Sequence, residues 1–304
     1  MAEWPASRLG GHPAARPPAS PVTAGGTDLE ALRQLAVELA TAAGDVVAEH
    51  HGRAAPVGVK SSRTDLVTAT DRAAESLITS RLERARPHDG IVGEEGASRA
   101  GSSGITWFID PIDGTTNFVY GHPGYAVSVG AAAGGRPLAG AVVDPLHGEV
   151  FSAARGGGAF CNGERLAVSS TVDLGSALVA TGFGYNEADR IHQGTVVAGL
   201  LGRVRDIRRM GSAALDLCSV ACGRVDAYYE YRLCPWDHAA GSLIASEAGA
   251  VTRSPVLEPP SRSGAGAVGF VLAAAPGVAP ALCDLLAELG AWPGGAPAGG
   301  VQDL

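Results

Sequence analysis

The sequence predicts an α/β protein in which sheets are layered with helices. Two observations predict this class. Short apolar segments bounded by glycine, proline or Asp-Pro turns follow one another through the middle of the chain. Beyond about residue 170, strand-like and helix-like segments alternate. With 304 residues the chain is long enough for a large buried core, in one domain or in two closely packed ones.

Two helices are expected before the first strand. Residues 28–49 follow a Thr27/Asp28 cap, carry leucine and valine among good helix formers, and end at a glycine. A second helix is expected to begin near Asp71 and to stop before Pro87.

Strands and further helices then follow in order. Five short strands are expected in the middle of the chain, at GIVGEE, TWFIDPI, YAVSVGAAA, LAGAVVDP and EVFSAA. Four more are expected at ALVATGF, VRDIRRM, VDAYYE and GFVLAAA. The helices that alternate with this second group are expected at residues 193–201, 212–222, 236–247 and 279–289.

Composition divides the chain into four stretches. Residues 1–27 and 291–304 are rich in proline and glycine and are expected to be disordered tails. Residues 28–170 are expected to form a sheet-rich α+β part, and residues 171–290 an α/β part. The first residues lack both a basic start and an apolar core, so they are not expected to be a secretory signal.

Charge and cysteine content limit the partners and the location. The net charge of -8 argues against nucleic acid or an acidic membrane surface as a main partner, because either would repel the chain. No apolar run approaches the roughly 20 residues of a membrane span. The five cysteines are an odd set without a CxxC pair, in a chain too large to need disulfides. A reducing cytoplasm is therefore the expected location.

The stretch TWFIDPIDGTTNF combines groups that bind cations with groups that bind anions. Asp110 is expected to end a strand and Asp113 to return to the same side after one turn, with the carbonyl of Ile112 between them. Mg2+ prefers oxygen donors of this kind. Gly114, Thr115 and Thr116 would then open a helix or a tight turn whose unpaired N–H groups point at an anion. The alternative is an ordinary Asp-Pro and Asp-Gly loop, in which the aspartates cap turns.

Other acidic residues favour the metal interpretation. Glu94 and Glu95 follow a strand through a glycine, and strand ends are a usual place for ligands in layered α/β folds. Asp237, in CPWDHAAG, and Asp71 each lie in the first turn of an expected helix. As alternatives, the glutamates are solvated loop charges and the two aspartates cap their helices. Capping and metal binding do not exclude each other.

These stretches resemble the motifs of a known family. WFIDPIDGTTNF and PWDHAAG together resemble the two signatures of the inositol monophosphatase family, among the Mg2+-dependent, lithium-sensitive phosphatases. VKSSRTDLVTATD, IVGEEG, GAFCNGERL and RRMGSAALDLCSVACGRVDAYYE match in the same order, so the resemblance covers about residues 28–290. The last of these stretches is most similar to the bacterial inositol-1-monophosphatase type. The resemblance implies a layered αβαβα sandwich of the sugar-phosphatase type and a homodimer.

The resemblance also implies a set of metal ligands. Glu94, Asp110 and the carbonyl of Ile112 would hold one Mg2+, while Asp110, Asp113 and Asp237 would hold a second. Two cations side by side clamp the attacking and leaving oxygens and lower the pKa of bound water. In relatives, Asp113 also meets the substrate.

Catalytic and phosphate-binding roles are implied in the same way. Asp71 and Thr115, together with Glu94, would position and deprotonate the attacking water. The backbone amides of Gly114 and Thr115 would hold the phosphate group. His238 follows a ligand on a helix, where neighbouring side chains point apart, so a surface or packing role is expected for it.

Substrate selection involves residues of the second half of the chain. The resemblance implies that Ala213, the backbone near Gly211 and the carboxylate of Glu230 meet the hydroxyl groups of the substrate. A carboxylate at position 230 could accept hydrogen bonds from two hydroxyl groups. The alternative for Glu230 is an ion pair with Arg232 or Arg208.

Lys60 is a further candidate for the site. It is the only lysine of the chain and falls in VKSSRTDLVTATD, beside the expected site. We interpret it as a position that needs a compact ammonium with rotatable donors, because a planar guanidinium would pack differently against carboxylates. The alternative is that the presence of a single lysine at this position is due to chance.

The sequence thus favours hydrolysis of a small phosphate monoester, with inositol 1-phosphate as the leading substrate, by metal-activated water. One alternative is a sister-branch phosphatase acting on fructose 1,6-bisphosphate, adenosine 3',5'-bisphosphate or histidinol phosphate. Another is a mainly partner-binding regulatory role, as some bacterial relatives resemble regulators of transcription complexes. Residues 96–106 are expected to be a short flexible loop, and in relatives this connection helps to carry a third, weaker Mg2+.

Overall fold

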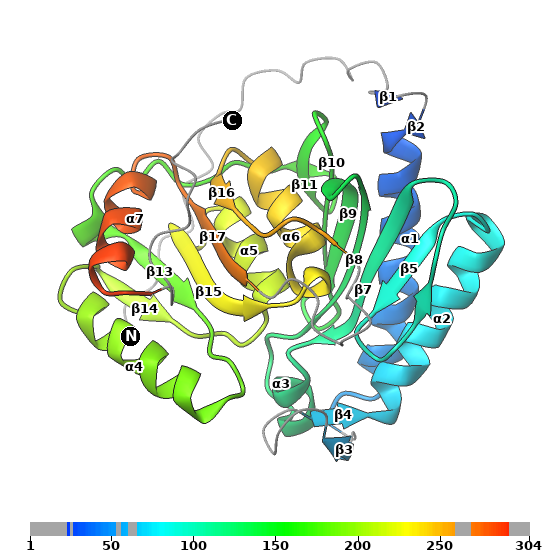
Figure 1. Ribbon diagram of the computed structural model, residues 1–304, viewed down its shortest axis with the longest axis horizontal. Helices are drawn as coiled ribbons and strands as arrows, with labels where there is room; N and C mark the ends of the chain where they lie inside the picture. Colours follow the sequence, from blue (N-terminus) through cyan, green and yellow to red (C-terminus); the bar gives the residue numbers. More distant parts are fainter. Residues whose placement is uncertain (1–22, 25–26, 53–55, 60–65, 259–268, 292–304) are drawn as a thin grey trace, which may run out of the picture.

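Two large β-sheets alternate with three layers of helices in the computed structural model of the protein (Figure 1). The structure describes residues 23–24, 27–52, 56–59, 66–258 and 269–291. Most of the two expected tails lies outside these residues, and so does Lys60. Within the first expected tail, Thr23–Ala24 (β1) pairs antiparallel with Thr27–Asp28 (β2).

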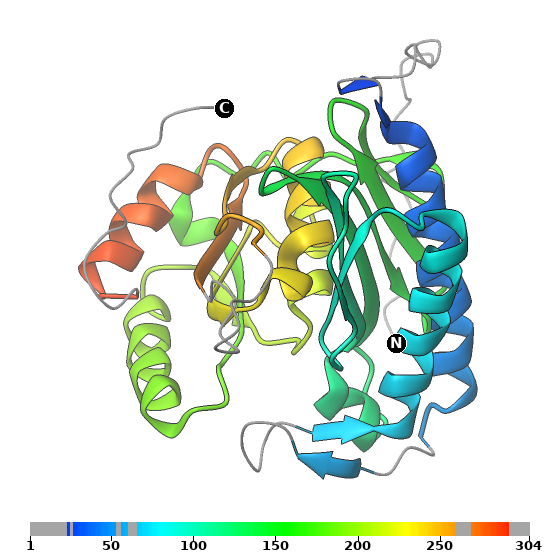
Figure 2. The same cartoon turned by 45° about the vertical axis from the view of Figure 1, so that its right-hand side comes forward.

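The first helical layer consists of α1 (Leu29–Glu49) and α2 (Ala69–Ala85). The Oδ1 atom of Asp28 accepts hydrogen bonds from the backbone N–H groups of Glu30 and Ala31 at 3.0 and 3.1 Å. The helix start predicted from the cap is therefore confirmed. Both helices bury their apolar sides against the first sheet (Figure 2).

The first sheet has eight strands in the order β12-β11-β10-β9-β8-β7-β5-β6. Only β5 and β7 run parallel; all other neighbours are antiparallel. The strands are β5 (Gly90–Gly93), β6 (Ser98–Arg99), β7 (Ile105–Asp113), β8 (Ala126–Ala133), β9 (Arg136–Asp144), β10 (Glu149–Ala154), β11 (Gly158–Cys161) and β12 (Glu164–Arg165).

The expectation that residues 96–106 form one flexible loop is wrong in part. Arg99 in β6 pairs with Ile91 of β5, and its guanidinium donates to the carbonyl oxygen of Asp89 at 2.7 Å. These partners hold the segment, although its Gly/Ser composition gives no local sign of a strand.

The second sheet has five strands in the order β14-β13-β15-β17-β16. They are β13 (Leu178–Thr181), β14 (Asp206–Arg208), β15 (Ala227–Leu233), β16 (Val251–Arg253) and β17 (Gly269–Ala274). Between the two sheets lie α5 (Ala213–Ala221) and α6 (Pro235–Glu247), whereas α4 (Glu187–Leu200) and α7 (Ala279–Glu288) cover the outer face (Figure 1).

The order of layers is therefore αβαβα, and the predicted fold class is confirmed. Every strand and helix expected from the sequence is present. The short helix α3 (Thr115–Tyr120) agrees with the helix or tight turn expected after Gly114. The smaller elements that were not expected are the pair β1 and β2, the pair β3 (Pro56–Val59) and β4 (Leu66–Thr68), the 3-10 turn η1 (Leu174–Ser176), the strand β11 and the edge strands β6, β12 and β16. Within the described ranges, none of the helices combines the length and apolar character needed to cross a membrane.

A pair of glycines sets the distance between α6 and the first sheet. Gly130 of β8 and Gly140 of β9 are direct neighbours in the register of the two strands. A Cβ atom at Gly130 would lie 3.0 Å from the Cβ of Ala239, and one at Gly140 would lie 2.9 Å from the Cα of Ala240. Because the neighbour at Gly140 is helix backbone, α6 could not pack this closely on any larger residue.

Candidate active site

The stretch that suggested a metal site lies at the end of β7. The strand does not stop at Asp110, as expected, but continues to Asp113 through an irregularity in its pairing with β8. Asp110 is 1% exposed, and its Oδ1 accepts the N–H of Ile112 at 3.1 Å. The hydroxyl of Thr115 donates to the carbonyl oxygen of Ile112 at 3.0 Å, which closes the turn.

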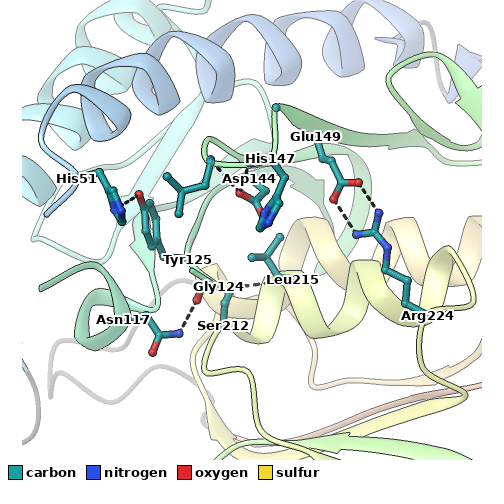
Figure 3. Close-up of polar contacts among 12 residues, drawn as sticks. His51, Asn117, Gly124, Tyr125, Asp144, His147, Glu149, Ser212, Leu215 and Arg224 are labelled. Atoms are coloured by element: carbon teal, nitrogen blue, oxygen red, sulfur yellow. Dashed lines mark hydrogen bonds and ion pairs between the residues drawn. The ribbon is translucent and has the colours of Figure 1, made fainter. Parts of the chain in front are cut away.

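Asp113 is held by the beginning of α5. Its Oδ2 accepts the hydroxyl of Ser212 at 2.7 Å and the N–H of Ala214 at 2.6 Å. Burial raises the pKa of Asp113 to about 6, partly offset by these donors. Ser212 also caps α5 by accepting the N–H of Leu215 at 3.2 Å (Figure 3). Sequence reasoning missed Ser212 at the site, although a serine just before a helix is a recognisable capping signal.

Glu94 lies beside Asp110. The N–H of Glu94 donates to the carbonyl oxygen of Ile109 at 3.1 Å, which attaches the loop after β5 to β7. The half-buried Glu94 side chain interacts directly with the Asp110 carboxyl and raises its pKa. Asp237 reaches the same region from the first turn of α6, where its Oδ2 accepts the N–H of Cys234 at 2.6 Å.

Like charges dominate the electrostatics of this group. Burial, and then Glu94, Asp113 and Asp237, raise the pKa of Asp110 well above its usual range. Burial, Glu94 and Asp113 do the same for Asp237. No basic side chain is among the main causes of the pKa shift of Asp110 or of Asp237. The structure thus brings the four predicted carboxylate ligands within electrostatic reach of one another, and their role as ligands stays a prediction.

The donor set fits a divalent cation by its chemistry, because several oxygen ligands with unbalanced negative charge are what Mg2+ selects. In the part of the chain that the structure describes, no three His, Cys, Asp or Glu side chains already form a cluster that could hold a metal ion. Asp113 and Asp237 instead direct an oxygen at backbone or hydroxyl donors. The contacts use Oδ2 of each side chain, which leaves Oδ1 of Asp113 and of Asp237 as the oxygens that could bind an ion.

Asp71 and Thr115 form a second part of the site. Asp71 is fully buried, and its Oδ2 accepts the N–H of Thr68 at 2.8 Å, so it caps α2. The hydroxyl of Thr115 lies 3.4 Å from its other oxygen, Oδ1. One carboxylate therefore both caps a helix and lies beside the Thr115 hydroxyl, whose single proton is donated either to Asp71 or to the nearer carbonyl oxygen of Ile112.

Glycines bring the predicted phosphate loop against the loop before α5. Gly114 has a φ of 97°, a region that favours glycine, and a Cβ there would lie 3.1 Å from the carbonyl oxygen of Gly211. The side-chain amide of Asn117 donates to the carbonyl oxygen of Gly124 at 2.7 Å (Figure 3). It also donates to the carbonyl oxygen of Met210 at 2.7 Å. Sequence reasoning missed this bridging role of Asn117, because one partner lies 93 residues away.

Glu230 lies on β15 of the second sheet. Its Oε2 accepts the hydroxyl of Tyr228 at 2.7 Å, and burial raises its pKa to about 7. A Cβ atom at Gly182 would overlap the Glu230 carboxylate, so the glycine makes room for it. The alternative ion pairs are wrong, since Arg232 bonds to Asp189 and Arg208 to Asp206.

Asp216 is an acidic residue near the site that sequence reasoning missed. It lies on α5, is 1% exposed, and neither carboxylate oxygen has a hydrogen-bond partner among the described residues. Burial, Glu230 and Asp113 raise its pKa well above the usual range. Only its position in an otherwise apolar helix marks it in the sequence.

His238 packs in the interior rather than at the surface. It is 1% exposed, neither ring nitrogen has a hydrogen-bond partner among the described residues, and burial lowers its pKa to about 4. Between this value and the usual 6.5, the unfolded chain binds more protons at this position than the folded protein does. The free energy of unfolding is therefore expected to fall as the pH drops from 6.5 to about 4.

Replacing His238 with phenylalanine is expected to make this pH dependence less steep, and urea titrations of both proteins across the interval measure it. Equal slopes for the two proteins would show that His238 does not contribute.

The layered fold, with buried carboxylates gathered beside a glycine turn at the end of a strand, defines a phosphoric monoester hydrolase of the α/β sandwich type. The chain belongs to the inositol monophosphatase family, whose sequence model matches residues 28–288.

Comparison with individual proteins agrees with this family. The chain is 50% identical over 242 residues to the inositol-1-monophosphatase SuhB of Mycobacterium tuberculosis, covering 77% of this chain and 81% of that protein. It is 44% identical over 215 residues to the Nus factor SuhB of Xylella fastidiosa, covering 70% and 78%. The solved structure of Mycobacterium tuberculosis SuhB matches with a TM-score of 0.72 at 43% identity, covering 86% of this chain and 97% of that one.

Proposed function

We propose that the protein hydrolyses inositol 1-phosphate to inositol and phosphate in a Mg2+-dependent reaction. The observation that carries this proposal is the gathering of Glu94, Asp110, Asp113 and Asp237 at one place. The name and the 50% identity of the mycobacterial relative support the choice of substrate.

Each residue of the site has a proposed task. Glu94, Asp110, Asp113, Asp237 and the carbonyl of Ile112 hold two Mg2+ ions. When bound, these ions supply positive charge to the phosphate and lower the pKa of water.

The remaining residues handle the proton and the phosphate. Thr115 and Asp71, linked by their 3.4 Å contact, orient the attacking water with Glu94, and the carboxylates accept its proton. The amides of Gly114 and Thr115 bind the phosphate oxygens.

The other end of the substrate is proposed to meet Glu230, Ala213 and the backbone at Gly211. A carboxylate with a pKa of about 7 can accept hydrogen bonds from ring hydroxyls when ionised, and Tyr228 fixes its orientation. Lys60, which lies outside the described residues, stays a candidate for the metal site on sequence grounds alone. We also propose a cytoplasmic homodimer with neither nucleic acid nor membrane as a main partner, from the family resemblance, the cysteine content and the net charge of -8.

A panel of phosphate esters tests the substrate assignment. Inorganic phosphate release is measured with and without Mg2+ from myo-inositol 1-phosphate, fructose 1,6-bisphosphate, adenosine 3',5'-bisphosphate and histidinol phosphate. We expect inositol 1-phosphate to give the highest kcat/KM, with release dependent on Mg2+. A higher kcat/KM for another ester would move the protein to a sister branch.

A regulatory function is a second candidate, because relatives at 44% and 41% identity are named Nus factors. Under this alternative the protein would act by binding a transcription complex. Co-purification from cells, compared between the wild type and an inactive variant, separates the two. Retention of transcription proteins by both would favour an added binding role.

A further inference from the structure

Glu75 of α2 holds the turn that follows β5. Its side chain is buried at 5% exposure, and its Oε2 accepts the N–H of Glu95 at 2.8 Å. The other oxygen, Oε1, accepts the N–H of Ala97 at 2.8 Å. A single carboxylate thus accepts hydrogen bonds from two backbone N–H groups of one turn. The negative charge of the carboxylate strengthens both bonds.

The turn is shaped around this carboxylate. The N–H of Gly93 donates to the carbonyl oxygen of Ala97 at 2.7 Å and closes the turn. A Cβ atom at Gly93 would overlap the Glu75 carboxylate, so a glycine is needed for the side chain to enter. The contact of Glu75 with the turn therefore depends on the backbone conformation on both sides of Glu94.

Glu94 lies between the backbone groups that Glu75 binds and strand β7. On one side its N–H bonds to the carbonyl oxygen of Ile109, the residue before Asp110. On the other side the next residue, Glu95, is bound by Glu75. The backbone of Glu94 is thus fixed on both sides, which restricts where its carboxylate lies relative to Asp110.

We propose that Glu75 is a positioning residue that presents Glu94 for cation binding, and this inference rests on the proposed function of Glu94 as a ligand. Glu75 does not need to touch the ion. Outer partners that fix a metal ligand typically change metal affinity about 10- to 100-fold when they are replaced. A purely structural role would lower stability and leave the affinity unchanged.

Glu75→Gln tests this inference, because the amide keeps the size of the side chain but turns an N–H group toward one of the two backbone donors. The readout is the rise in melting temperature as Mg2+ is titrated into metal-free protein, with calorimetric binding of Mn2+ as a second measure. We expect the half-saturating Mg2+ concentration to rise about 10-fold or more. The KM for inositol 1-phosphate at saturating Mg2+ is expected to change less.

Two controls on the same helix separate positioning from stability. Glu83→Gln removes a carboxylate that is 53% exposed and lies 3.8 Å from Arg99; it should leave the titration unchanged, because an exposed ion pair contributes little and Arg99 keeps its strand pairing and its bond to Asp89. Ile78→Val loosens the core beneath α2 and should lower the melting temperature without moving the half-saturating concentration. An unchanged concentration in Glu75→Gln, or an equal shift in Ile78→Val, would overturn the inference. A wild-type protein that shows no response to Mg2+ would instead overturn the proposed function, and the inference with it.

Discussion

Asp110→Asn is expected to abolish Mg2+-dependent phosphate release from inositol 1-phosphate, with a loss in kcat/KM of at least about 100-fold. Asp110 is buried beside Glu94, Asp113 and Asp237, and the family resemblance makes its carboxylate the common member of both proposed metal positions. Replacing even an outer partner of a ligand costs about 10- to 100-fold, and a shared ligand should cost more. Phosphate release under saturating Mg2+ measures the effect.

Although Asp110→Asn should lower activity, it is expected to raise the stability of the metal-free protein. Burial and three acidic neighbours oppose ionisation of Asp110, so a neutral amide should raise the melting temperature in Mg2+-free buffer near pH 8. Adding Mg2+ should then raise it less than in the wild type. Asp45→Asn, an exposed change on α1, is the matched control and should behave as the wild type. Full activity in Asp110→Asn would remove the basis of the proposed site.

Gly140→Val is expected to destabilise the protein by about 3 kcal/mol, at the upper end for an overfilled core. The new side chain would meet the Cα and Cβ of Ala240, already 2.9 Å from the Cβ position, and helix backbone cannot turn aside. Because α6 carries Asp237 one turn earlier, displacement of the helix should also lower activity. Urea denaturation and phosphate release measure the two effects.

Gly194→Val on α4 is the matched control, since nothing lies within 4 Å of the Cβ position there. We expect a change within about 0.5 kcal/mol and unchanged activity. If both valine variants were equally stable, the close packing of α6 on the sheet would not depend on glycine.

Local pattern was sufficient to predict most of the fold. The cap at Asp28 and the helical spacing after it define α1, and the stretch TWFIDPI defines most of β7, although the strand continues to Asp113. The edge strands β6 and β16 were missed because two or three residues carry too little pattern, and only pairing with a neighbour makes them strands. Their existence depends on tertiary contacts that local composition does not record.

For the site as well, local motifs predicted some features, and others depend on contacts between distant segments. Asp110 and Asp113 were recognised from one short motif, and the acidic residues that accompany them from helix starts and a strand end. What holds these residues was not predictable, because the donors come from distant segments: Ser212 is 99 residues from Asp113. The position of Asp216 in an otherwise apolar helix did not reveal its place near the site, because its closeness to Glu230 arises from the packing of α5 on β15.

The bonds between the β7 turn and the segment before α5 limit how the molecule can move. Ser212 and Ala214, at the start of α5, hold Asp113 of β7, and Asn117 of α3 holds Met210 in the loop before α5, so the first sheet and the middle helical layer are joined beside the site. A hinge rotation that moved the start of α5 away from β7 would break all of these bonds together. Substrate exchange is therefore expected to occur with α5 fixed against the end of β7, and local motion of side chains and loops would set how fast product leaves.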